Sequence, residues 1–208
     1  MPLWWPIPVL SAFLLAAWLT PLARNIAIRF GVLDVPGGAR KHHSAPMPLM
    51  GGLGIVAAFF VVTIGVLFST DVLTSGAITI WHFVGFFLGI LILTIGGVLD
   101  DRFDLPAKYL FAVMVAASLI AVIGGIDVAK LTNPFGGFFV LPAVLASIVA
   151  FVWILAMTMT TKLLDGVDGL AASVSMIAAL MIAALALTPM YFQSDVALLA
   201  LIFAASIL

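Results

Sequence analysis

The sequence contains no cysteine and no glutamate, and it is poor in charge of either sign. Without cysteine, the chain can form neither disulfides nor thiolate metal sites. Only 8% of its 208 residues are charged and 65% are hydrophobic, whereas an ordinary soluble domain has about 25% charged residues. Such a chain cannot hide its apolar surface in water, so we expect the lipid bilayer to be its solvent. The formal net charge of −1 argues against a nucleic acid held by electrostatic attraction as a partner.

Long uncharged intervals divide the sequence. They cover residues 1–23, 44–70, 72–99, 109–126, 131–161, 169–194 and 196–208. A helix needs about 20 apolar residues to cross a hydrocarbon core of about 30 Å, so each of the first six intervals is predicted to hold one spanning helix. The seventh has room for only about 20 Å of helix, and its end would leave backbone carbonyls unsatisfied in the bilayer. We therefore expect an all-α, polytopic transmembrane bundle, a single domain over 1–208 with six complete spans and a truncated seventh.

The basic residues are distributed unequally between the two faces that six crossings predict. The connecting segments 24–43, 100–108 and 158–169 share one face and hold all but one of the eight basic residues. The opposite face holds only Lys130. Because Lys and Arg in short loops mark the cytoplasmic side, we predict that these three segments lie inside and the N-terminus outside. The same segments hold most of the aspartates, which this sorting does not require: Asp34, Asp100, Asp101, Asp104, Asp165 and Asp168.

An acidic cluster, Asp100-Asp101-Arg102-Phe103-Asp104, directly follows an apolar run. On a helix, Asp100 and Asp104 would share a face, with Asp101 beside them. Three carboxylates so close together repel one another unless a cation is present. Hard oxygen ligands suit Mg²⁺, which takes one or two carboxylates together with substrate phosphates. The plain alternative is a charged loop that ends a transmembrane helix.

A second acidic cluster, Asp165-Gly166-Val167-Asp168-Gly169-Leu170, lies at another predicted cytoplasmic helix boundary. Asp165 and Asp168 are three residues apart and would face the same way on a helix. The glycines permit close approach of the backbone to a ligand. An ordinary Asp-Gly turn between two spans is the alternative, but two such clusters at the same bilayer edge favour a site.

A basic loop precedes the second span. Arg40 and Lys41 could hold phosphate, although a positive-inside anchor explains their charges as well. That alternative does not explain the prolines and glycines of 36–38 and 46–52. Together with the acidic clusters, this loop indicates a metal and a polyphosphate at the inner leaflet, the components of phosphoryl-group transfer.

The three motifs, in this order, resemble those of the polyprenyl-phosphate N-acetylhexosamine-1-phosphate transferases, the WecA, TagO and MraY superfamily of glycosyltransferase family 4. The loop looks like the signature Asp-x-Pro…Arg-Lys-x-His-x-x-Pro-x-Pro-x-x-Gly-Gly, in register over 40–52. Residues 100–108 look like the Asp-Asp-x-x-Asp motif, and 165–170 look like Asp-Gly-x-Asp-Gly-Leu. The likeness covers nearly the whole chain.

The resemblance implies the reaction. A polyprenyl phosphate, usually undecaprenyl phosphate in bacteria, attacks the β-phosphate of a UDP-N-acetylhexosamine, and UMP leaves. Mg²⁺ is required, and the product begins a surface glycan such as lipopolysaccharide or peptidoglycan of the cell wall. The resemblance further implies the cytoplasmic face of the bacterial inner membrane and a homodimer in that membrane.

The resemblance also implies roles for particular residues. The catalytic residues would all be aspartates: Asp100, Asp101, Asp104, Asp165 and Asp168. Asp100, Asp101 and Asp168 would bind the metal, and the Asp100–Asp101 pair would alternatively deprotonate the lipid phosphate. The substrate-binding residues would be basic: Arg40, Lys41, His43 and Lys162.

Two departures from the family pattern bear on activity. Lys162 stands where members commonly carry an asparagine, three residues before the second acidic motif, which would change nucleotide binding. The later Gly-Asp metal motif and the His-rich sugar-recognition loop have no counterpart within the 208 residues. We therefore expect this chain alone to be inactive, and neither the sugar nor the choice between covalent and direct transfer can be read from it.

Two other functions fit parts of the pattern. A CDP-alcohol phosphotransferase would share the start of the 165–170 motif, but Ser173 stands where its arginine belongs. A membrane transporter would carry ionisable residues near mid-span, whereas these aspartates lie at one boundary. An inactive fragment is the remaining alternative.

Overall fold

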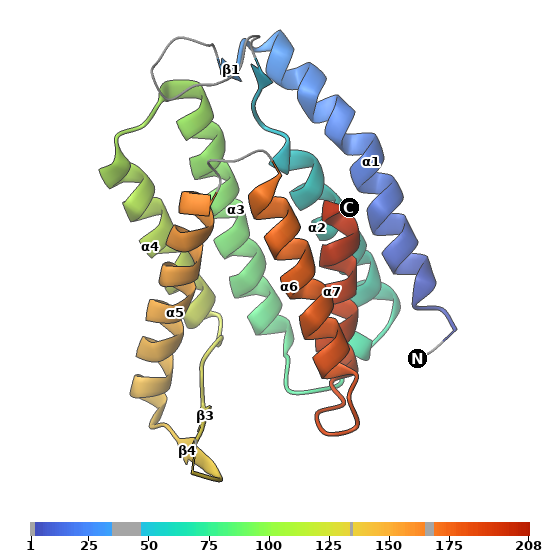
Figure 1. Ribbon diagram of the computed structural model, residues 1–208, viewed down its shortest axis with the longest axis vertical. Helices are drawn as coiled ribbons and strands as arrows, with labels where there is room; N and C mark the ends of the chain where they lie inside the picture. The colour runs from blue at the N-terminus through green and yellow to red at the C-terminus, as the bar shows by residue number, and fades with distance from the viewer. Residues whose placement is uncertain (1–2, 35–46, 134, 165–168) are drawn as a thin grey trace. The chain divides into compact units, whose positions relative to one another are not determined.

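The computed structural model describes residues 3–34, 47–133, 135–164 and 169–208, which form seven α-helices, one short 3₁₀ helix and two short β-hairpins (Figure 1). The helices are α1 (Pro6–Arg29), α2 (Gly52–Ser69), α3 (Ile80–Phe103), α4 (Ala107–Ile123), α5 (Ala143–Leu164), α6 (Leu170–Ala186) and α7 (Ser194–Ile207), with the 3₁₀ helix η1 at Val72–Thr74. One α-helix overlaps each uncharged interval of the sequence. The predicted class, an all-α membrane bundle, is confirmed.

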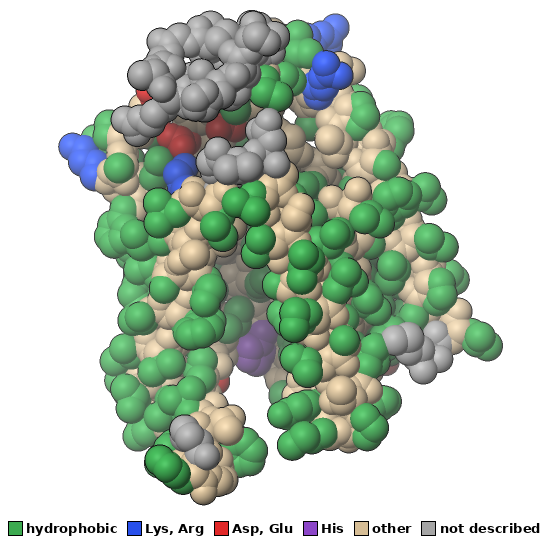
Figure 2. Space-filling view, in the orientation of Figure 1, with side chains coloured by type: hydrophobic (Ala, Val, Ile, Leu, Met, Phe, Trp, Pro, Cys, Tyr) green, Lys and Arg blue, Asp and Glu red, His purple; other side chains and the backbone are tan. Residues whose placement is uncertain are grey.

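Helix length differs between two groups. Four helices, α1, α2, α3 and α5, are 18 to 24 residues long and apolar enough to cross a membrane. The helices α4 and α6 have 17 residues each and α7 has 14, which is fewer than the roughly 20 that a complete crossing needs. The count of six complete spans therefore stays a prediction. Hydrophobic side chains run along the visible surface of the helices, as a lipid-facing surface requires (Figure 2).

Two hairpins interrupt the helical pattern. Strand β1 (Leu33–Asp34) pairs antiparallel with β2 (Met47–Pro48), and β3 (Lys130–Thr132) pairs antiparallel with β4 (Phe138–Val140). Neither hairpin is predicted from the sequence, because charge spacing alone does not detect strands of two or three residues. Phe138-Phe139-Val140 is a run with high β-propensity, and Gly136 and Gly137 in the turn have φ values of +110° and +80° that favour glycine.

The helices belong to two compact units. The first comprises the described residues of 1–77, 98–104 and 172–208. In it α1 packs against α2 and α7, and α2 packs against α7. The buried face of α1 is built from small residues: Ala12, Ala16, Ala23 and Ala27. A Cβ on Gly54 of α2 would lie 2.8 Å from the backbone nitrogen of Thr20, so the two backbones nearly touch. Small contact residues permit such close packing, which drives helix association where lipid removes the hydrophobic effect.

The second unit comprises the described residues of 78–97 and 105–171. Its helices α3 and α4 meet through glycines. A Cβ on Gly85 would lie 2.6 Å from the Cα atom of Gly124, and a Cβ on Gly96 would lie 2.5 Å from a methyl carbon of Val113. Helix α4 also packs against α5. The α3–α4 contact therefore has no room for a side chain at Gly85.

Candidate functional site

The predicted site residues are divided between described and undescribed parts of the chain. Asp100, Asp101, Asp104 and Lys162 are described. The other five lie outside the described residues, and their roles stay predictions: Arg40, Lys41, His43, Asp165 and Asp168.

Asp100 and Asp101 lie in the last turn of α3, and both are half-buried. The negative end of a helix macrodipole favours cations, so carboxylates in the last turn oppose it. Helix stability therefore does not explain why two adjacent acids stand here. A cation beside them, from the chain or from a ligand, or a reaction that needs carboxylates would explain it.

Asp104 lies past the end of α3, which stops at Phe103. Its backbone φ is +48°, the left-handed conformation that usually ends a helix at glycine or asparagine. Its N–H still donates to the carbonyl oxygen of Asp100 at 2.8 Å. Pro106 follows as the N-cap of α4. Helix α3 thus ends one residue before Asp104, so Asp100 and Asp104 do not share one helical face as predicted. The exposed Asp104 instead forms the turn into α4.

The predicted metal ligands include residues that the structure describes and one that it does not describe. Over the residues that the structure describes, no group of three Asp, Glu, His or Cys side chains is arranged to hold a metal ion. The predicted ligand set takes its third member, Asp168, from outside those residues. Two adjacent carboxylates nevertheless match the donor chemistry of Mg²⁺, which takes one or two carboxylates and leaves other positions to substrate phosphate.

Helix α1 ends in a Schellman motif. Gly31 has a φ of +66° and donates its N–H to the carbonyl oxygen of Ile28, while Val32 donates to the carbonyl oxygen of Ala27 at 2.9 Å. Val32 is buried, as the hydrophobic contact of this motif requires. The glycine that follows Arg29-Phe30 is a sequence signal for the end of this helix.

Arg102 of α3 reaches the same helix end. Its Nη1 donates to the carbonyl oxygen of Phe30, the C-cap residue of α1. The last carbonyls of a helix have no partner within the helix, and a cation there also interacts favourably with the macrodipole. The bond ties the end of α3 that carries Asp100 and Asp101 to the end of α1.

The β1–β2 hairpin follows directly on this contact. Leu33 pairs with Pro48 and Asp34 pairs with Met47, and the N–H of Leu49 donates to the carbonyl oxygen of Val32 at 3.2 Å. Asp34 and Met47, the described residues that precede and follow segment 35–46, therefore lie side by side. Both ends of segment 35–46, which contains the predicted phosphate-binding residues, are fixed a few residues from Phe30.

Lys162 lines a pocket within the second unit. The pocket has a volume of about 430 Å³ and lies among α3, α4 and α5. Its walls include Gly97, Met114, Thr158 and Thr161, and a Cβ on Gly97 would meet no heavy atom within 4 Å. The hydroxyls of Thr158 and Thr161 donate to backbone carbonyls of their own helix at 2.8 Å. The interior is thus largely apolar, with the exposed residue Lys162 on its wall, and it suits an apolar chain with an anionic head.

Comparison with known proteins gives one consistent picture. Residues 83–208 match the family described as Glycosyl transferase family 4. The chain is 34% identical over 170 residues to the "Probable undecaprenyl-phosphate N-acetylglucosaminyl 1-phosphate transferase" of Bacillus subtilis, covering 82% of this chain and 45% of that protein. It is 32% identical over 188 residues to the "Decaprenyl-phosphate N-acetylglucosaminephosphotransferase" of Mycobacterium tuberculosis, covering 83% and 43%.

A third relative is more distant. The chain is 28% identical over 178 residues to the "Undecaprenyl-phosphate alpha-N-acetylglucosaminyl 1-phosphate transferase" of Escherichia coli K12, covering 80% of this chain and 43% of that protein. The chain therefore spans less than half the length of the curated relatives that it matches.

Proposed function

Because the chain belongs to glycosyl transferase family 4, we propose that it forms part of an enzyme that transfers N-acetylglucosamine 1-phosphate from UDP-N-acetylglucosamine to a polyprenyl phosphate. The observation that carries this proposal is the half-buried Asp100–Asp101 pair in the last turn of α3, where helix stability disfavours acids. The three relatives described above all have N-acetylglucosamine in their names. These names favour that sugar among the N-acetylhexosamines.

The proposed reaction exchanges one phosphoryl bond for another. An oxygen of the lipid phosphate forms a bond to the β-phosphorus of the UDP-sugar, the bond from that phosphorus to the bridging oxygen breaks, and UMP leaves with the oxygen. The lipid phosphate must lose its remaining proton to be a strong nucleophile. A carboxylate of the Asp100–Asp101 pair, at the end of a membrane helix, is the group proposed to take that proton.

Mg²⁺ is the proposed cofactor. Asp100 and Asp101 would hold it from α3, together with Asp168, and their oxygen donors fit this metal. When bound, the metal neutralises negative charge on the diphosphate oxygens. Asp165 is proposed to line the part of the site that holds the nucleotide and the metal.

The lipid substrate fits two features of the chain. The apolar pocket at Lys162 suits a polyprenyl chain whose phosphate lies near an ammonium group. Segment 35–46, whose two ends are fixed by the β1–β2 hairpin, supplies Arg40, Lys41 and His43 for the phosphate. We place the reaction at the cytoplasmic face of the bacterial inner membrane because basic residues concentrate at that boundary, and the proposal includes a homodimer.

The test measures UMP release by membranes that contain a form of the protein as long as its relatives. Membranes receive UDP-N-acetylglucosamine, undecaprenyl phosphate and Mg²⁺, and lipid-linked sugar is measured in parallel. Asp101→Asn should abolish both products, since an amide cannot take a proton. Asp127→Asn is the control, because it makes the same change at an exposed aspartate that follows the C-terminal end of α4, away from the last turn of α3. Near-normal turnover by the Asp101 variant would count against the proposal.

A further inference from the structure

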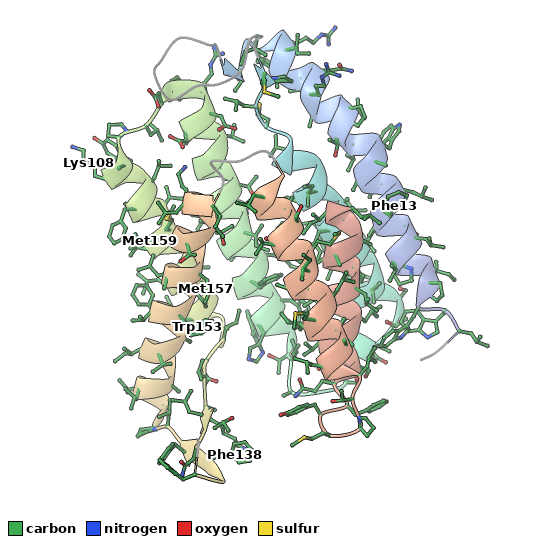
Figure 3. All side chains as sticks on the ribbon, in the orientation of Figure 1. Phe13, Lys108, Phe138, Trp153, Met157 and Met159 are labelled. Atoms are coloured by element: carbon green, nitrogen blue, oxygen red, sulfur yellow. The ribbon has the colours of Figure 1, made fainter. Side chains whose placement is uncertain are left out.

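The β3–β4 hairpin exposes an unusual amount of apolar surface. The structure describes all of residues 130–140 except residue 134. Phe138 projects from the hairpin (Figure 3), and the exposed apolar side chains are Leu131 at 41%, Phe135 at 98%, Phe138 at 69%, Phe139 at 56% and Val140 at 73%. Contiguous exposed apolar surface of this kind marks a site of interaction with a protein or a membrane.

The apolar side chains lie on both faces of the hairpin. Cross-strand partners share a face, so Leu131 and Phe139 lie on one face and Thr132 and Phe138 on the other. A two-sided sheet in water normally hides one face and solvates the other. Here each face exposes a phenylalanine, which favours immersion in an apolar layer over docking through one face.

The backbone groups between the two strands of the hairpin are paired. Beyond the strand pairing, Asn133 donates its N–H to the carbonyl oxygen of Gly137 at 3.1 Å, and Gly136 donates to the carbonyl oxygen of Asn133 at 3.0 Å. The N–H of Phe135 donates to the Oδ1 atom of Asn133 at 3.0 Å, and Leu141 donates to the carbonyl oxygen of Ala129 at 2.9 Å. The outer edge of each strand stays open in a two-stranded sheet, so this backbone suits the membrane interface, where water and headgroups supply partners, and not the hydrocarbon core.

The position of the hairpin along the helices agrees with a membrane boundary. Helix α4, with 17 residues, is about 25 Å long and α5, with 22 residues, is about 33 Å long, so only α5 is long enough for a core of about 30 Å. The chain after α4 continues along α5, where Val128 donates to the carbonyl oxygen of Ala146 at 3.4 Å. The hairpin follows at the N-terminal end of α5 (Figure 1).

An exposed tryptophan lies beside the C-terminal end of α4, before the chain reaches the hairpin. Trp81, in the first turn of α3, is 71% exposed, and tryptophan is enriched at membrane–water interfaces. A Cβ on Gly124, the C-cap of α4, would lie 3.1 Å from the carbonyl oxygen of Trp81. The start of α3 and the end of α4 are therefore side by side, at the opposite end of α3 from Asp100.

We propose that the β3–β4 hairpin is a membrane-interface anchor that inserts into the phospholipid leaflet at the end of α3 opposite Asp100. The phenylalanines lie among the upper parts of the acyl chains. The exposed Lys130, at the base of the hairpin, places its ammonium group among the lipid phosphates, where an anionic headgroup complements its charge. The anchor fixes the depth of α4 and α5, because one strand follows α4 and the other precedes α5. This inference does not depend on the proposed enzymatic reaction.

The absence of cysteine in the chain permits a direct test with single-cysteine variants. Phe138→Cys and Phe139→Cys, one for each face, are spin-labelled and reconstituted into vesicles of phosphatidylcholine and phosphatidylglycerol. Collision with oxygen, which concentrates in lipid, is compared with collision with a water-soluble nickel chelate. The matched control is Ser75→Cys, since Ser75 is exposed in the polar segment between α2 and α3.

The expected result is a nickel collision rate several-fold lower at both hairpin positions than at the Ser75 position, with oxygen collision retained. Nickel collision equal to that of the control would place the hairpin in water and overturn the proposal. Low collision with both reagents would show that protein covers the hairpin, which would also overturn it. Two independent labelling positions keep the test decisive if one variant fails to fold.

Discussion

Arg102 donates a hydrogen bond from its guanidinium Nη1 to the carbonyl oxygen of Phe30, a residue 72 positions earlier in the chain. The bond joins the C-terminal ends of α1 and α3. Arg102 follows directly after the Asp100–Asp101 pair, and Phe30 lies just before the β1–β2 hairpin that fixes both ends of segment 35–46. This contact therefore joins the first acidic motif to the end of the helix that precedes the basic loop.

Loss of the Arg102 contact should reduce both stability and turnover. In Arg102→Met the carbonyl oxygen of Phe30 loses its charged donor, and we expect a loss of about 0.5–1.5 kcal/mol in the free energy of unfolding, because the bond is exposed. Arg102→Lys should recover part of both properties, since an ammonium group keeps the charge but not the planar fork. Thermal unfolding in detergent and UMP release in a form as long as the relatives are the measurements. Equal behaviour of the Met variant and the unmodified protein would show that the contact has no role.

Gly31 should be required for its backbone conformation and not for its small size. A Cβ at Gly31 would meet no heavy atom within 4 Å, but φ is +66°, so Gly31→Ala should cost about 1 kcal/mol. Gly31→Asn should cost less, because asparagine tolerates this conformation. Gly51→Ala is the control, since Gly51 also has open space but a φ of −57°. A drop in melting temperature for both alanine variants alike would contradict this explanation.

The α3–α4 contact should not tolerate a side chain at Gly85. In Gly85→Ala the new methyl group would lie 2.6 Å from the Cα atom of Gly124, and backbone cannot yield as a flexible side chain can. We expect a loss of about 1–3 kcal/mol, the usual range for overpacking. Gly97→Ala, on the same helix with no heavy atom within 4 Å of the added Cβ, should be close to neutral. Thermal unfolding of the two variants in the same detergent makes the comparison, and equal losses would exclude the close contact as the cause.

Arg40 should affect the use of the lipid more than the chemical step. Arg40→Ala removes one of several positive charges proposed near the lipid phosphate, so the apparent KM for undecaprenyl phosphate should rise several-fold while kcat changes little. Raising the salt concentration should reduce the difference between the variant and the unmodified protein. Kinetics of UMP release at varied lipid concentration provide the measurement. An unchanged KM for the lipid would remove Arg40 from the proposed binding residues.

The sequence by itself determined the class of the protein and the order of its helices. Scarcity of charge and the length of each uncharged interval are local properties, and a bilayer converts them directly into helices because every backbone group in lipid needs a partner within its own segment. One helix overlaps each interval, and the pair Asp100–Asp101 lies at a helix end as its place after an apolar run predicts. The family follows from short motifs whose spacing is also local.

Only the tertiary structure decided how these pieces meet. Helical periodicity predicted that Asp104 shares a face with Asp100, but a left-handed turn at Asp104 ends the helix at Phe103. A hydropathy pattern cannot show the dihedral angle of one residue. The bond from Arg102 to Phe30 and the contact of Gly85 with Gly124 join residues far apart in the chain. In a membrane such contacts arise from close packing and satisfied backbone groups, and these depend on which helices become neighbours, a property that no single segment of the sequence contains.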